Sequence, residues 1–542
     1  MFRGRGAAKN HERPLVAEQP GYSELMEQAS QLVGELNYAQ AAGLYEKAIL
    51  AVRKLPREER HSCEGRTRRE YADICIVLGW WDRAERELRQ VLDLTREMPP
   101  EQRVLGWLAL GNLMANRGDP EQATTCFFSA QDLAEEHELG RELALTRCNL
   151  GSIAGRTGNL EEARSLIDQT LQDLPKLPEH PGNAELEAAL WTQLGLYHFR
   201  MARLQPAESA LQKALDLLPP STLEEGNIRR YLGVIAGLRR KPKSALEFHM
   251  QALDIFLKAS CIFGQAKVYE SIGRTFLAVN RMEEAIHTFK KSEAICARLG
   301  ANAELATLAG KLGQVYMLRE DFATAANYFR RDLEISSRFR NYYTLGFSHR
   351  NLGRCLIQLG SLDEAISHLH VSLEMFRAIE ETLSEGRVHM DLCQAHLRRS
   401  RPLEATGHCQ RARSIFSQYG MHSELTFLDC LQASVARLSG DLSGAEEQLT
   451  AAIGKFAATG SSAWLAEAHH EMGILRLEQG LKSEAIEAFK EAVRTARQAG
   501  LNRESGRYLH ELELLSESEL YRTWSEGLED AETRPLVPPG GE

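Results

Sequence analysis

The sequence predicts an all-α protein, an α-solenoid in which about twelve helical hairpins follow one another and capping helices close the C-terminal end. Three observations predict it: a repeat of 40 residues, helical spacing of apolar residues within each repeat, and a composition of helix formers with 43% hydrophobic, 26% charged and 7% aromatic residues. A chain of 542 residues exceeds the usual size of one hydrophobic core. A repeat avoids this limit because each unit buries its apolar face only against its neighbours.

The repeat is defined by two small-residue markers. A small residue, usually Gly after Leu, is followed twelve residues later by Ala, and in seven consecutive units both markers recur at steps of 40 without a slip. Five looser units precede them, which gives twelve in all. The first markers of the regular units are Gly233, Gly273, Gly313, Gly353, Cys393, Ala433 and Gly473, and the second are Ala245, Ala285, Ala325, Ala365, Ala405, Ala445 and Ala485. The looser units carry Ala29, Ala72, Gly111, Gly151 and Gly195 at the first position.

Each unit is predicted to be a hairpin of two helices. In the second helix of one unit Ala285, Ile286 and Phe289 fall at helical spacing, and Val268 and Ile272 do so in the first. The turn between the helices is signalled by Gly, which suits a left-handed C-cap, followed by a polar helix-starting residue. Such turns stand at Gly118-Asp119, Gly158-Asn159, Gly360-Ser361 and Gly440-Asp441.

These residues resemble the tetratricopeptide repeat pattern, L-G-x-x-Y followed by A-x-x-x-F. The segment Leu312-Gly313-Gln314-Val315-Tyr316 carries it with Ala325 and Phe329, and Ala285/Phe289, Ala123/Phe127 and Ala485/Phe489 carry it in part. The 40-residue period resembles the longer-helix variety of Pins/LGN polarity scaffolds, kinesin light chain and bacterial scaffold and sensor modules. The resemblance covers roughly residues 22–512. It implies a right-handed superhelix whose concave groove is lined by the first helix of each unit.

The pattern divides the chain into five segments. Residues 1–21 are predicted to be a disordered basic tail, residues 22–221 the irregular units one to five, and residues 222–500 the regular units six to twelve. Residues 501–526 are predicted to form capping helices, and the acidic, Pro- and Gly-rich residues 527–542 a disordered tail.

Charge and cysteine use restrict the partners and the compartment. The net charge of −10 and the pI of about 6.0 provide no positive field for DNA or RNA, so we expect no nucleic-acid partner. The ten cysteines show no metal-ligand spacing, and we interpret them as reduced and mostly buried. We find no secretory signal and no apolar stretch of membrane-spanning length, and therefore expect a cytoplasmic protein without a membrane partner.

The motif search favours a protein without catalysis. We find no P-loop, G-x-S-x-G, H-E-x-x-H or kinase motif set, and we expect neither an enzyme nor a cofactor. The nearest approach to a metal signal is His368-Leu369-His370 with His349, or His469-His470. Because ligands need convergent geometry, we interpret these histidines as exposed helix residues and predict no metal site.

The resemblance also implies which side chains face the groove: those two or three residues before the marker Gly and the one after it. In units seven to nine we predict that these residues bind the partner, by gripping an extended acidic segment or its backbone. They are Arg274, Lys311, Gln314, Arg350, Asn351 and Arg354. Other units carry Glu27, Glu70, Asp391 and Glu471 at the same positions, so a solvated face of mixed charge is the open alternative.

The leading hypothesis is a non-catalytic scaffold or adaptor that binds a peptide or protein segment in its concave groove. The alternative is a regulator that senses a ligand or peptide and controls a separately encoded effector, such as a protease, a kinase or a transcription factor. The identity of the partner and the oligomeric state stay open.

Overall fold

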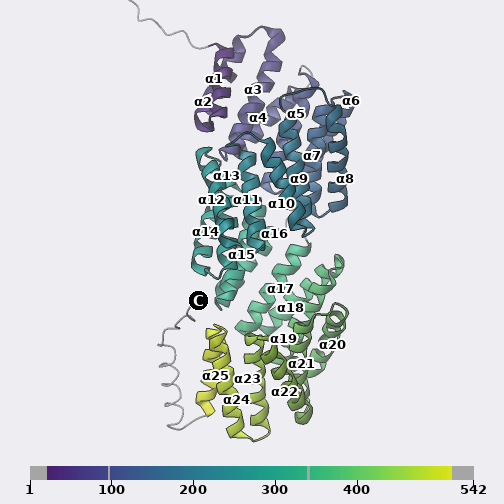
Figure 1. Cartoon of the computed structure of the whole chain (residues 1–542), viewed down its shortest axis with the longest axis vertical. Coiled ribbons are helices and arrows are strands. Elements are labelled where there is room, and N and C mark those ends of the chain that lie inside the picture. The colour runs from purple at the N-terminus through teal and green to yellow at the C-terminus, as the bar shows by residue number, and fades with distance from the viewer. Residues whose placement is uncertain (1–20, 95–97, 338–341, 516–542) are drawn as a thin grey trace, which may run out of the picture. The chain divides into compact units, whose positions relative to one another are not determined.

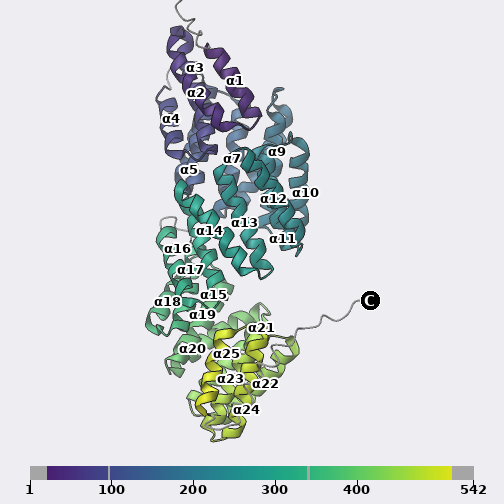
Figure 2. The ribbon, with the colours of Figure 1, turned by 90° about the vertical axis from the view of Figure 1, so that its left-hand side faces the viewer.

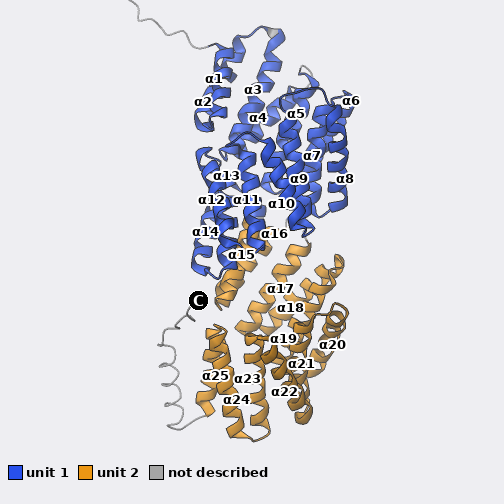
Figure 3. Ribbon diagram, in the orientation of Figure 1, with its two compact units in different colours: residues 1–304 blue, residues 305–542 orange. Residues whose placement is uncertain are grey.

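The computed structural model describes residues 21–94, 98–337 and 342–515, and all regular structure in these ranges is helical. The predicted tails, apart from residue 21, and the residues of the predicted cap beyond 515 lie outside them. The chain forms two compact units, residues 1–304 and 305–542, which divide within one helix (Figure 3). The predicted segment boundaries, including the one at residues 221–222, stay predictions.

Unit 1 contains fourteen complete α-helices among its described residues (Figure 1). They are α1 (Tyr22–Gly34), α2 (Tyr38–Ala51), α3 (Arg57–Val77), α4 (Trp81–Asp93), α5 (Pro100–Arg117), α6 (Pro120–Glu136), α7 (Gly140–Thr157), α8 (Leu160–Asp173), α9 (Asn183–Arg200), α10 (Leu204–Leu217), α11 (Leu223–Leu238), α12 (Pro242–Lys258), α13 (Ile262–Ala278) and α14 (Met282–Leu299), with short 3-10 turns at Val52–Lys54 and Leu174–Lys176.

Unit 2 begins within α15 (Asn302–Leu318) and contains ten further α-helices in its described part. They are α16 (Phe322–Ser336), α17 (Tyr342–Leu359), α18 (Leu362–Ala378), α19 (Thr382–Arg398), α20 (Pro402–Gln418), α21 (His422–Leu438), α22 (Leu442–Thr459), α23 (Ser462–Glu478), α24 (Lys482–Gln498) and α25 (Asn502–Leu515).

Within each unit, successive helices pair as hairpins (Figure 2). Odd-numbered helices also contact the next odd-numbered helix, as in α3 with α5, α7 with α9, and α19 with α21. Even-numbered helices make no comparable contact with one another in the described ranges, so the odd-numbered helices form the inner side of each stack. The described residues therefore form twelve hairpins followed by α25, which confirms the predicted α-solenoid.

The helices end at residues in the left-handed backbone conformation, which recur every 20 residues. Arg240, Ser260, Asn280, Gly300 and Glu320 all have positive φ, and the same step runs from Gly360 to Gly500. The N–H of the following residue donates to a carbonyl five residues back, as from Cys261 to Phe256 over 2.8 Å, which closes the helix end. Each helix of a regular unit together with its turn thus spans 20 residues, which explains the 40-residue period.

The marker glycines make room for large side chains sixteen residues later. A Cβ at Gly273 would lie 2.7 Å from Cδ1 of Phe289, and one at Gly313 would lie 2.9 Å from Cε1 of Phe329. Both phenylalanines are fully buried. The spacing from Gly to Phe in the sequence is therefore a packing contact between the two helices of one hairpin.

In unit 1, helices nine elements apart come into contact. Trp81 on α4 packs edge-on against Phe263 on α13, with ring centroids 5.1 Å apart, and only 3% of Trp81 is exposed. Unit 2 repeats this interval between α16 and α25, where the Arg503 guanidinium lies 5.0 Å from the centroid of the Phe322 ring. Each stack therefore curves far enough for late helices to touch early ones of the same unit.

In the described ranges, no helix combines the length and apolar character that crossing a membrane requires.

Candidate partner-binding site

The six predicted partner-binding residues lie on three inner helices. Arg274 is an exposed residue of α13 in unit 1, where its guanidinium lies 3.8 Å from the Glu270 carboxylate of the same helix. Lys311 and Gln314 are partly buried on α15. The other three, Arg350, Asn351 and Arg354, belong to α17 in unit 2.

The residues on α17 differ in what they can offer a partner. Arg350 donates from Nε to Oδ2 of Asp391 on α19 over 2.5 Å, and Asn351 is only 2% exposed. Arg354 is exposed and lies 3.9 Å from the same Asp391 carboxylate, while its surroundings lower the pKa of Arg354 by desolvation. Two of the three therefore have structural contacts within the inner face. Partner binding by all six residues stays a prediction.

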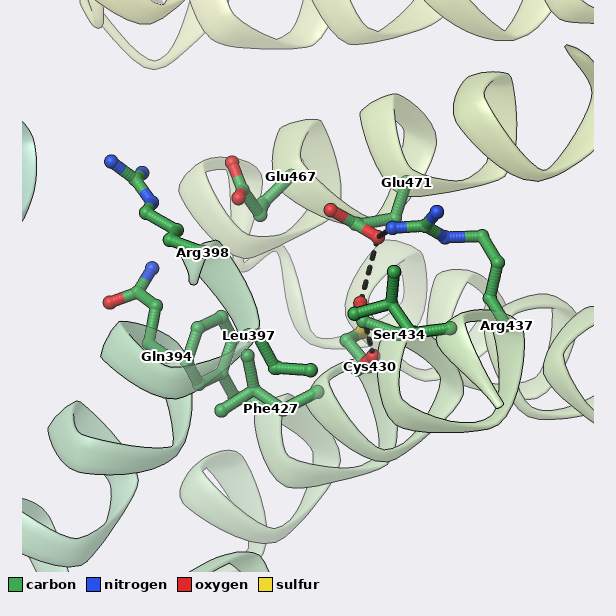
Figure 4. A pocket seen from close by; sticks show the side chains of 11 residues that line it. Gln394, Leu397, Arg398, Phe427, Cys430, Ser434, Arg437, Glu467 and Glu471 are labelled. Atoms are coloured by element: carbon green, nitrogen blue, oxygen red, sulfur yellow. Dashed lines mark hydrogen bonds and ion pairs between the residues drawn. The ribbon is translucent and has the colours of Figure 1, made fainter. Parts of the chain in front are cut away.

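A pocket opens one helical turn beyond Asp391, between α19, α21 and α23 of unit 2 (Figure 4). Its volume is about 160 Å³. An apolar cavity of about 150 Å³ holds a benzene molecule, so this pocket is large enough for one apolar side chain. It is lined by Gln394, Leu397, Arg398, Phe427, Cys430, Leu431, Ser434, Arg437, Leu438, Glu467 and Glu471.

The pocket combines an apolar floor with charged groups of both signs. Leu397, Phe427 and Leu431 provide apolar surface, and Figure 4 shows Arg398 at one end and Arg437 beside Glu471 at the other. This is the usual chemistry of a site that anchors one apolar side chain and orients its polar neighbours.

The charges around Glu471 are held by short contacts. Ser434 on α21 donates to Oε2 of Glu471 on α23 over 2.7 Å, and Arg437 lies 3.4 Å from the same oxygen. Arg437 also pairs with Glu478 over 2.5 Å. This network joins α21 to α23 and fixes one side of the pocket.

Glu467 lies on the other side and is bound by residues of α25. Tyr508 donates to Glu467 over 2.5 Å, and Arg507 lies 3.4 Å away. Burial raises the pKa of Glu467, but His470, Arg507 and the Tyr508 hydrogen bond outweigh it, and the net shift is downward. Glu467 is therefore ionised at neutral pH.

Glu467, His470 and Glu471 are the one group of three ligand-type side chains in the described ranges whose donor atoms converge, within 4.8 Å of one another. Glu467 and Glu471 already have protein partners, and His470 Nε2 lies 2.7 Å from Glu511 while its Nδ1 has none. The His470 ring also stacks on Tyr508 at 4.4 Å. The expectation that His470 is exposed is wrong: it is 5% exposed, because α25 covers it.

Two histidine pairs lie between neighbouring helices of unit 2. Nδ1 of His349 lies 2.9 Å from Nδ1 of His368, and 40 residues later His389 and His408 repeat this contact at the same distance. Burial lowers the pKa of His349, His389 and His408 to about 4, so these rings are neutral at pH 7 and one donates to the other. His349 and His368 are partly buried, contrary to expectation.

The cysteines fit their interpretation. Eight of the ten are buried and all ten are free. Burial raises the pKa of Cys148 and Cys355 to about 12, so both thiols are protonated at neutral pH.

The hairpin stack, its small-residue markers and its inner helices define a tetratricopeptide repeat protein. The family model described as the MalT-like TPR region matches residues 226–519, more than half of the chain, and the chain belongs to this family.

Individual relatives are distant. The chain is 21% identical over 184 residues to outer dynein arm-docking complex subunit 4 of Danio rerio, which covers 34% of this chain and 37% of that one. It is 34% identical over 86 residues to an uncharacterised protein of Rhizobium meliloti (strain 1021), covering 16% of this chain and 8% of that one. The matches thus span much less than two thirds of either relative.

Among solved structures, the apo form of RapI superposes with a TM-score of 0.52 at 14% identity. The match covers 66% of this chain and 98% of RapI. At this identity the likeness concerns the fold alone.

Proposed function

We propose that this protein is a non-catalytic interaction scaffold, which captures an extended segment of a partner protein on the inner helices of unit 2. The single observation that carries the proposal is the pocket between α19, α21 and α23. Its apolar floor suits one anchoring side chain, and Arg398 and Glu471 offer charges to the polar groups on either side of that anchor.

The exposed Arg354 and the partly buried Gln314 extend this surface along unit 2 in the proposal. Arg350 supports it indirectly, because its ion pair with Asp391 holds α17 against α19, the helix that carries three pocket residues. The partner segment then needs one apolar residue flanked by charged or polar ones.

A peptide-display selection against the purified full-length chain tests the proposal. We expect enrichment of peptides with one large apolar residue, and loss of their binding in Leu397→Glu, which introduces a charge into the apolar floor. Leu403→Glu is the matched control, because Leu403 is 85% exposed on α20 and lies outside the pocket. Selected peptides that bind equally well to Leu397→Glu would refute the site.

A specific contact favours sensing as a second candidate function. Arg398 lines the pocket and also donates to the carbonyl of Ile357 on α17 over 3.1 Å. On the other side, Glu467 is bound by Tyr508 and Arg507 of α25. A ligand that moves Arg398 would therefore alter a contact with α17, and one that moves Glu467 would alter the contacts of α25. A change in the radius of gyration when a selected peptide binds would support sensing, and an unchanged radius would favour the passive scaffold.

A further inference from the structure

A cation is buried without a counter-ion on the inner face of unit 1. Arg230 on α11 is 8% exposed, and its Nε has no hydrogen-bond partner. No carboxylate of the described residues forms an ion pair with its guanidinium, which lies 4.0 Å from the centroid of the Tyr231 ring. Burying an unpaired charge is strongly unfavourable, because the group loses its hydration without gaining a counter-ion. Such a group therefore points to an anion that completes it.

Three more cations lie on neighbouring inner helices. Arg156 stands at the end of α7, Arg200 at the end of α9 and Lys267 in α13. None of the three has an ion-pair partner among the described carboxylates. Arg156 instead donates to the carbonyl of Ala115 over 3.2 Å, and Lys267 Nζ lies 4.1 Å from the ring of Phe263. Four successive repeats thus contribute one cation each.

The four cations share one electrostatic environment. Burial raises the pKa of Tyr231, but Arg230, Lys267 and Arg200 outweigh it and lower the pKa to about 8. The pKa of Lys267 is lowered by burial, with Arg156 and Arg230 acting in the same direction and Glu304 on α15 opposing them. Glu304, the carboxylate that acts on Lys267, is thus outnumbered by the cations Arg156 and Arg230.

We propose that Arg156, Arg200, Arg230 and Lys267 form a second binding site, on the inner face of unit 1, for an extended peptide segment that carries several carboxylates. The distribution of the cations along the stack favours an extended ligand over a compact one. They lie on α7, α9, α11 and α13, one on each of four successive inner helices, and so follow the stack instead of surrounding one point. Arg guanidinium groups bind carboxylates with paired hydrogen bonds. The site goes beyond the pocket of unit 2 and does not depend on it.

Tyr231 provides an internal reporter of the site. The same cations stabilise ionised Tyr231 and a ligand carboxylate. Ionisation of Tyr231 therefore weakens ligand binding, and ligand binding makes Tyr231 harder to ionise. The charged groups that act on Tyr231 and on Lys267 are Arg200 from α9, Arg230 from α11, Arg156 from α7 and Glu304 from α15. A bound acidic peptide should therefore raise the pKa of Tyr231 above 8, and its affinity should fall as the pH rises through about 8.

The experiment uses the full-length chain and a labelled short polyglutamate peptide, with polyglutamine as the uncharged control and fluorescence anisotropy as the readout. We expect the chain to bind polyglutamate but not polyglutamine. The affinity for polyglutamate should be at least about tenfold lower in the Arg200→Gln, Lys267→Gln double variant than in the wild type. These two side chains are not fully buried, so the variant spares the fold better than a change at Arg230. Leu397→Glu should leave polyglutamate binding unchanged, which separates this site from the pocket of unit 2.

A second measurement follows tyrosinate absorbance during a pH titration. Polyglutamate should shift the most acidic tyrosine of the wild type to higher pH, and that tyrosine should be missing in Tyr231→Phe. No shift, or equal binding by wild type and double variant, would overturn the proposal. If inorganic phosphate at matched ionic strength displaced polyglutamate and produced the same shift, the site would bind a small anion and the peptide assignment would be wrong.

Discussion

Arg350 on α17 and Asp391 on α19 form a buried ion pair, with 2.5 Å between Nε and Oδ2 and side-chain exposures of 13% and 6%. The pair joins two successive inner helices of unit 2. Its two members occupy neighbouring repeats, and both were identified in the sequence as groove positions. Their packing against each other gives them a structural role within the inner face.

Removing one member of this pair should be costly. Arg350→Ala leaves Asp391 buried beside only the more distant Arg354, and we expect the free energy of unfolding to fall by about 3–5 kcal/mol. The double variant Arg350→Leu, Asp391→Leu should lose less free energy of unfolding, because it leaves no unpaired charge buried. Chemical unfolding followed by circular dichroism measures both. Lys258→Ala, which breaks the exposed pair with Asp254, is the control and should change little. Equal losses in the single and double variants would contradict the argument.

A methyl group at a marker glycine should destabilise its hairpin. The Cβ of Gly313→Ala would lie 2.9 Å from the Phe329 ring, and we expect a loss of about 1–3 kcal/mol from overpacking. Gly407→Ala is the matched control: this glycine lies inside α20, and its Cβ would meet nothing within 4 Å. It should be neutral or stabilising, because Ala is the better helix former. The midpoint of thermal unfolding should therefore fall in Gly313→Ala, whereas in Gly407→Ala it should stay the same or rise.

His249 occupies the position that Phe or Leu holds in the neighbouring repeats, and neither ring nitrogen has a partner. Burial, with Arg230 and Arg274 nearby, lowers its pKa to about 3, below the ordinary value of 6.5. A lowered folded pKa means that stability is complete above about 6.5 and falls as the pH drops from there toward 3. His249→Leu should raise stability by about 1–3 kcal/mol at neutral pH and flatten this acid dependence. An unchanged acid dependence in the variant would place the titrating group elsewhere.

The contact of α25 with the start of unit 2 should weaken as the pH rises. Burial and a hydrogen bond with Glu504 raise the pKa of Glu320 to about 7. One buried oxygen of each carboxyl lacks a partner, which a proton shared between them would satisfy. Because the folded pKa is raised, this stabilisation is complete below the ordinary value of 4.5 and is lost as the pH rises through 7.

Hydrogen exchange of α25 amides measures this effect: protection should fall as the pH rises through about 7, after correction for intrinsic exchange. Glu504→Gln removes one of the two charges and should reduce the dependence. If protection of α25 were equally pH-dependent in Glu504→Gln, the carboxyl pair would not be its cause.

The repeat architecture was predictable because its cause is local. Gly273 and Phe289 face each other within one hairpin, and the other repeats that carry the marker glycine make the same contact with a side chain sixteen residues later. Periodicity in the sequence therefore reports packing directly. The candidate site was predictable only in part. Gln394 and Ser434 stand one residue after a marker, like Arg274, and extending that rule to later units would have found them.

By itself, the sequence determined the helical hairpin and its 40-residue period, since these depend on contacts between residues close in the chain. Which helix of each hairpin faces inward was implied only by the family resemblance. The tertiary structure decided which inner side chains pair with one another and which have no partner among the described residues. Asp391 neutralises Arg350 from the next repeat, α25 covers His470, and no carboxylate pairs with Arg230 in the described ranges. Burial and pairing arise from neighbouring repeats brought together by the stack, and spacing within one repeat carries no record of them.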